Sequence, residues 1–139
     1  MSAPIDLLKS AVKSAVALGR ENNWEEFYAT YARLFYAPEF PQNRNDDQRQ
    51  ALRLMIMTKG LPAPTSQNGV QAYQGAWYAL NRLVGEDHDA RDYELFGLVY
   101  YRLGAEADAQ KVFQAGLDIA HKKDDAELCG AFLRHLSLF

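Results

Sequence analysis

The sequence has very little cysteine: Cys129 is the single one in 139 residues. One cysteine cannot form an internal disulfide, so the chain fits a reducing compartment and we expect a cytoplasmic protein. Long apolar runs are also missing, because Lys9 and Lys13 interrupt the apolar residues near the N-terminus. We therefore expect neither a secretion signal nor a membrane-spanning segment.

An excess of basic residues is absent too. The chain has 15 Lys and Arg residues against 18 Asp and Glu residues, which gives a net charge of −3. Because the positive charges are scattered among acids, nothing favours nucleic acid or acidic membranes as partners. Apolar residues make up 48% of the chain, which argues against disorder and for one globular domain over residues 1–139.

Sequence motifs of known catalytic, nucleotide-binding and metal-binding sites are also absent. We find no phosphate-binding glycine loop, no Gly-x-Ser-x-Gly, no His-Glu-x-x-His and no paired-cysteine zinc spacing. The spacing of Cys129 from His121 and His135 does not bring all three side chains to one compact metal site. The acidic stretch 85–92 is more simply a solvated loop with a helix cap than a cation site. We expect no enzyme, no cofactor and no metal.

Apolar residues with a helical period run through most of the chain. They predict an all-α fold of about seven helices in antiparallel hairpins. The expected parts are two irregular hairpins over residues 4–36 and 46–84, the clearest hairpin over residues 90–123 and a last helix over residues 124–139. The expected N-caps are Asn23, Asn45, Asp89 and Asp124, and the glycines expected to end helices are Gly19, Gly60 and Gly104.

The second expected helix carries an aromatic stripe made of Trp24, Phe27, Tyr28, Tyr31 and Phe35. Such a stripe is either a ligand-binding box or core, and core is the commoner use at helical spacing. Two methionines of the third helix, Met55 and Met57, likewise suit an adaptable binding face or an irregular core. Gly75 is expected to mark a close contact with a neighbouring helix.

The stretch from Asp92 to Ala120 gives the sharpest pattern. Its first helix has a stripe of Tyr93, Phe96, Gly97, Tyr100 and Gly104, and its second has Ala109, Val112, Phe113, Gly116 and Ala120. Large side chains of one helix can lie over small residues of the other, so we expect two closely nested helices. Gly104 should end the first helix by adopting a positive φ.

These residues resemble the signature of a tetratricopeptide (TPR) repeat. The signature is seen in Tyr93-x2-Phe96-Gly97-x2-Tyr100, followed by Ala109-x3-Phe113, with Gly104 at the turn and Gly116 at a later small position. The closing proline of the signature is missing. The resemblance implies a right-handed superhelix of helical hairpins with residues 124–139 as a capping helix.

The resemblance also implies a function, which is binding a peptide or helix in a concave groove, as a non-catalytic adaptor or chaperone does. In this family the first helix of each repeat lines the groove, which selects Arg91, Glu94, Leu98, Tyr101 and Arg102 here. Lys9 and Lys13 of the first helix would extend a cationic lining. The asparagine of the family's carboxylate-clamp pattern is absent, so that activity is not carried over.

Other functions stay open at this point. The apolar end of the chain, Leu136 to Phe139, favours a structural subunit that forms a homo-oligomer or joins a fixed complex. Small chaperones of bacterial type III secretion are similar in size, in their all-helical plan and in the phrase YYRLG before an amphipathic helix. No group of residues in the sequence supports an enzyme that would use its scattered acidic side chains. The sequence does not identify the protein partner.

Overall fold

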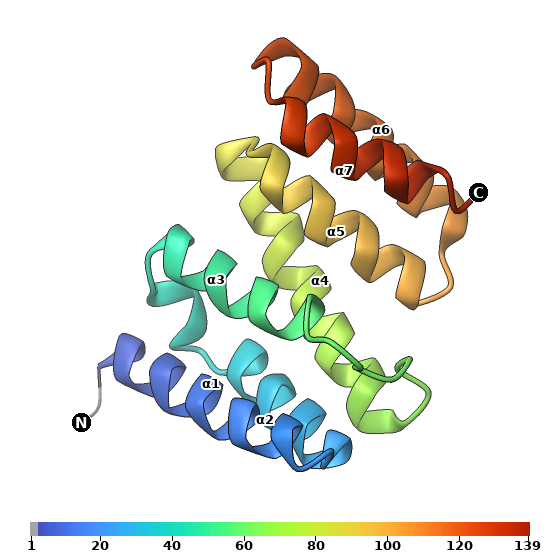
Figure 1. Cartoon of the computed structure of the whole chain (residues 1–139). Coiled ribbons are helices and arrows are strands. Elements are labelled where there is room, and N and C mark those ends of the chain that lie inside the picture. Colours follow the sequence, from blue (N-terminus) through green and yellow to red (C-terminus); the bar gives the residue numbers. More distant parts are fainter. Residues whose placement is uncertain (1–2) are drawn as a thin grey trace. The chain divides into compact units, whose positions relative to one another are not determined.

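The computed structural model describes residues 3–139, which form helices and no strand (Figure 1). In chain order the elements are α1 (Pro4–Arg20), α2 (Trp24–Tyr36), the 3-10 helix η1 (Phe40–Gln42), α3 (Asn45–Ile56), α4 (Gln67–Asp87), α5 (Ala90–Arg102), α6 (Glu106–Lys122) and α7 (Ala126–Leu136). The all-α fold with seven α-helices is therefore confirmed for the described residues.

The chain divides into two compact units, residues 1–79 and 80–139, and the boundary falls inside α4. We describe each unit by itself. The single domain over residues 1–139 and the right-handed superhelix stay predictions.

In the first unit, α1 and α2 form a hairpin with a tight turn. Gly19 was expected to end α1, and this is wrong, because the helix runs through Arg20. The turn residue with positive φ is Asn22 (φ 57°), and asparagine is one of the few residues that adopts this conformation readily. The side chain of Asn23 accepts a hydrogen bond from the backbone N–H of Glu26 at 3.5 Å, so the predicted cap of α2 is confirmed.

The aromatic stripe of α2 is core. Phe27, Tyr28, Tyr31 and Phe35 are all buried, and the ring centroids of Phe27 and Tyr31 lie 5.1 Å apart. The ring of Phe35 meets that of Phe40 from η1 edge-on at 5.3 Å. The interpretation of this stripe as core, and not as a ligand box, is confirmed for these four rings.

The first half of α4 packs on α2 at Gly75. A Cβ atom added to Gly75 would lie 2.9 Å from the Cβ of Phe35, closer than real Cβ contacts come. The close helix contact expected at Gly75 is therefore confirmed.

The start of α3 differs from the expectation. Asn45 does not cap the helix but is its first residue, and Arg44 precedes it without a side-chain cap. The amide of Gln48 is buried and donates to the carbonyl of Asn43 at 2.7 Å, which ties α3 back to the preceding loop. The Gln48 side chain thus fixes the loop that precedes α3.

In the second unit, α5 and α6 form the hairpin that the sequence predicts most clearly. Gly104 lies in the turn with φ 87°, as expected. A Cβ on Gly97 would lie 2.3 Å from Cε1 of Phe113, so the Phe113 ring rests directly on the backbone of α5. The close nesting of these two helices is confirmed.

The same arrangement joins α6 to α7. A Cβ on Gly116 would lie 2.3 Å from Cζ of Phe132, a fully buried ring of α7. The cap of α7 is Asp125, which accepts from the N–H of Leu128 at 3.1 Å, and not Asp124. Asp124 has a positive φ of 54° and belongs to the turn.

We predict that Gly97→Ala destabilises the protein by about 1–3 kcal/mol, because the new methyl group overlaps the Phe113 ring. Gly97→Leu should cost more. Urea denaturation measures the change, and Gly85→Ala is the control, since a Cβ there has no neighbour within 4 Å. In the control, helix propensity should raise stability by up to about 1 kcal/mol. Equal stability of Gly97→Ala and the parent would contradict the nesting, and Phe113→Leu should recover part of the loss.

Candidate functional site: a groove between α1 and α3

An open groove of about 500 Å³ lies in the first unit, where the C-terminal halves of α1 and α3 meet the beginning of α2. The residues that line it are Val16, Gly19, Arg20, Trp24, Phe27, Tyr31, Gln50, Arg53, Leu54, Met57, Thr58 and Lys59. The volume falls within the range of protein binding sites.

The floor of the groove is aromatic and rigid. Phe27 and Tyr31 are one helical turn apart on α2 and are almost fully buried, so packing on all sides fixes both rings. Trp24 stands edge-on to Phe27, with ring centroids 5.3 Å apart, at the beginning of the same helix. The burial of Tyr31 raises the pKa of its phenol above the ordinary value of tyrosine.

The walls are apolar and open to solvent. Val16 is 39% exposed on α1, and Leu54 and Met57 are 39% and 43% exposed at α3. Three of the nine exposed large hydrophobic side chains in the described part of the chain therefore gather in one groove. Clustered exposed apolar side chains, unlike single ones, are a mark of interaction surfaces.

The rim is positively charged. Arg20, Arg53 and Lys59 are the charged residues among those that line the groove, and no Asp or Glu is among them. The lining also has no histidine or cysteine. It offers contacts and positive charge, and it has no carboxylate, imidazole or thiol that would act as a general base.

Residues 3–139 hold no group of three or more His, Cys, Asp or Glu side chains that could bind a metal ion. None of the helices formed by these residues has the length and apolar character that a membrane crossing requires.

The groove residues that the sequence predicts on α5 lie in the other unit, and two of them are buried. Glu94 is 5% exposed, and its Oε2 lies 2.9 Å from Nε2 of His135 on α7. Leu98 is 7% exposed and lies one helical turn further along the same side of α5. The ring of Tyr101, on the next turn, meets the ring of Phe139 edge-on at 5.7 Å. Glu94 and Leu98 are thus not open to a partner, because α7 and the residues after it lie along this side of α5.

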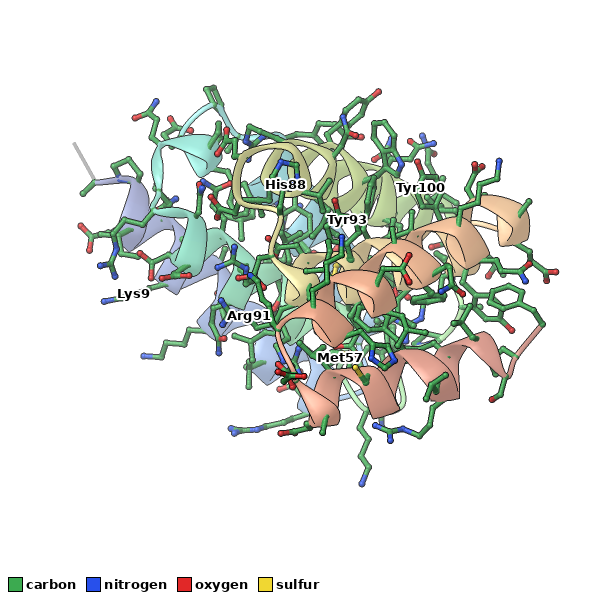
Figure 2. The ribbon with its side chains drawn as sticks, turned by 90° about the horizontal axis from the view of Figure 1, so that it is seen from above. Lys9, Met57, His88, Arg91, Tyr93 and Tyr100 are labelled. Carbon is green, nitrogen blue, oxygen red and sulfur yellow. The ribbon has the colours of Figure 1, made fainter. Side chains whose placement is uncertain are left out.

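The remaining predicted residues are more open. Arg91 lies at the beginning of α5 (Figure 2), where it is exposed and pairs with Asp89 at 2.6 Å. Arg102 is half-buried. Asp89 also accepts from the N–H of Arg91 at 2.9 Å, which confirms it as the cap of α5. Partner binding by Arg91, Tyr101 and Arg102 stays a prediction.

Lys9 and Lys13 are exposed on α1, and Lys9 extends away from the helix (Figure 2). They recur at helical spacing with Val16 and Arg20, so they lie on the side of α1 that borders the groove, beyond the groove itself. Partner binding by Lys9 and Lys13 stays a prediction.

The residues of α3 in this groove were not selected from the sequence, although a signal was present. The buried side of α3 is formed by Ala51, Leu52, Met55 and Ile56. Leu54 and Met57 are apolar but lie outside that side, where an amphipathic helix normally places polar residues. Apolar residues of this helix that do not belong to its one buried stripe could have indicated the groove.

Comparison of the chain with protein-family models, with curated proteins and with solved structures finds no match. The geometry of this groove is therefore the basis for a proposed function.

We predict that Tyr31→Phe reduces the loss of stability at high pH. An unfolded tyrosine loses its proton near about pH 10, whereas buried Tyr31 keeps its proton to higher pH. The unfolded state then binds fewer protons, so the stability contributed by Tyr31 is full below about pH 10 and falls as the pH rises above it. Urea unfolding from pH 8 to pH 11 measures this, and parallel curves for parent and variant would contradict it.

We also predict that Glu94 and His135 are energetically coupled, because their hydrogen bond is shielded from water and the His135 ring stacks on Phe113 at 4.9 Å. A double-mutant cycle with Glu94→Ala and His135→Ala should give a coupling of about 1–3 kcal/mol. The control cycle is the exposed pair Arg44–Asp47, for which we expect a much smaller coupling. Equal coupling in the two cycles would show that α7 does not depend on this pair.

Proposed function

We propose that this chain is a non-catalytic protein-interaction module whose α1–α3 groove binds a peptide or helix of another protein. The observation that carries the proposal is the gathering of exposed Val16, Leu54 and Met57 over a fixed aromatic floor. Apolar side chains of a partner would gain contact area there, and the rigid floor would lose little entropy on binding.

A protein segment suits this groove better than a small polar molecule does. Two helices border the groove and one helix closes its floor, which is the arrangement that accepts an amphipathic helix or an extended peptide. Met57 has an unbranched, polarizable side chain that adjusts to different partner surfaces. Adaptor and chaperone roles both use such a groove.

The resemblance to TPR repeats supports the same function, because the α5–α6 hairpin has the nested packing that the signature implies. A cytoplasmic location is part of the proposal, and its support is the single cysteine. A role as a small type III secretion chaperone is supported only by the resemblance in size, in the all-helical fold and in the YYRLG segment.

A second function is favoured by one observation. Leu133 is 57% exposed on α7 and Leu138 is 54% exposed just after it. This apolar surface supports the alternative of a structural subunit that self-associates or joins a fixed complex through its last helix. Phe139 contributes less to it, since its ring already contacts Tyr101 and Phe113.

We predict that Leu54→Ala with Met57→Ala weakens binding of the natural partner about 30-fold, since two anchor contacts of about 1 kcal/mol each are lost. Quantitative affinity capture from the source cells finds the partner, and calorimetry with the purified partner measures the affinity. Leu7→Ala is the matched control, because Leu7 is 40% exposed on α1 and Leu54 is 39% exposed, but Leu7 does not line the groove.

Three results would decide against the groove. A captured partner that binds the double variant and the parent equally well would exclude it. Leu7→Ala losing as much affinity as the groove variant would show that the effect is not local. A mass that rises with concentration and returns to that of the monomer with Leu133→Ala would favour the structural subunit.

A further inference from the structure

The charge around the α1–α3 groove is unlike that of the chain. The whole chain has more acidic than basic residues, 18 against 15, yet the groove has Arg20, Arg53 and Lys59 and no acid. A positive rim around apolar walls is complementary to a ligand that is both apolar and negatively charged.

Two of these cations have no acidic partner of their own. Arg20 and Lys59 are exposed, and neither forms an ion pair with another residue in the range 3–139. Three arginines elsewhere in the described residues pair with neighbouring acids. These pairs are Arg44 with Asp47, Arg49 with Asp46 and Arg91 with Asp89. The groove thus holds positive charge that is available to a ligand.

A purely local role explains part of this arrangement. Arg20 and Arg53 lie in the last turns of α1 and α3, where a positive charge complements the helix dipole. That role does not account for Lys59, which lies beyond the end of α3, or for the exposed apolar walls between the cations.

The positive charge continues along α1. Lys9, Lys13 and Arg20 recur on the side that carries Val16, and Asp6 ends this row near the start of the helix. From Lys9 to Arg20 the row is about 16 Å long at 1.5 Å per residue. It would contact about three turns of a partner helix.

We infer that the occupant of the groove is an acidic amphipathic segment of another protein. Its apolar residues would contact Val16, Leu54 and Met57, and its carboxylates would pair with Arg20 and Lys59. This inference rests on the proposed function and adds the chemistry of the partner. A nucleic acid is disfavoured, because its phosphates would meet a chain of net charge −3.

Selection from a library of random peptides displayed on phage tests the inference, with the full chain as bait. Peptides that depend on the groove are those retained by the parent chain and lost on the Leu54→Ala, Met57→Ala variant. We expect them to combine apolar residues at helical spacing with an excess of Asp and Glu. Synthetic copies should bind the Arg20→Glu, Lys59→Glu variant about tenfold or more weakly, because attraction becomes repulsion.

The matched control is Lys111→Glu with Lys122→Glu, two exposed lysines of α6 that change the net charge by the same amount. Affinity for the peptides should stay within about twofold of the parent, since neither lysine lines the groove and salt screens exposed charges. Circular dichroism and urea unfolding establish that every variant is folded before its affinity is compared.

The outcomes separate the inference from the proposed function. Peptides that depend on the groove but have no acidic excess would overturn the inference and leave the proposed function in place. Equal losses in the groove and α6 charge variants would also overturn it, because net charge alone would then explain the binding. If no selected peptide depends on Leu54 and Met57, the proposed function itself fails.

Discussion

Close contacts between an aromatic residue of one helix and a glycine of a neighbouring helix occur in both units. In the second unit the Phe113 ring lies on Gly97 and the Phe132 ring lies on Gly116. In the first unit the Cβ of Phe35 approaches Gly75 to a distance that excludes any side chain there. The helices therefore approach closely, and the large apolar area of a ring is buried without a void. Glycine weakens a helix by roughly 1 kcal/mol relative to alanine. Glycine at these positions therefore lowers the stability of the protein unless the close packing of the helices compensates for the loss.

This packing decides which surfaces are left for binding. The rings of α2 are engaged with other rings, so the groove above Phe27 and Tyr31 has a floor that cannot move. What remains exposed is two apolar side chains that the core does not need, Leu54 on α3 and Met57 directly after it. A fixed floor with adjustable walls suits recognition of another chain, since only the wall side chains have to rearrange.

The parts of the structure that follow from local sequence were predictable. Spacing alone identified the α5–α6 hairpin, the positive φ at Gly104 and the aromatic core of α2. One error arises because two neighbouring residues are equally suited to one role. Asp124 and Asp125 can both cap α7, and only the turn geometry, with a positive φ at Asp124, selects Asp125. The α1–α3 groove was not predictable in the same way, because it depends on which side of α3 faces α1.

Glu94 shows why the binding surface had to be sought away from the repeat-like hairpin. Its position on α5 is one that a repeat of this kind would use for a ligand, and the structure fills it with His135 of α7. A buried carboxylate is tolerated there because a hydrogen bond replaces its water, and the stacking of His135 on Phe113 fixes the partner. The last helix thus occupies the side of α5 that a ligand would have used. In the first unit, by contrast, Leu54 and Met57 stay exposed beside α1, and the proposed binding function belongs to that groove.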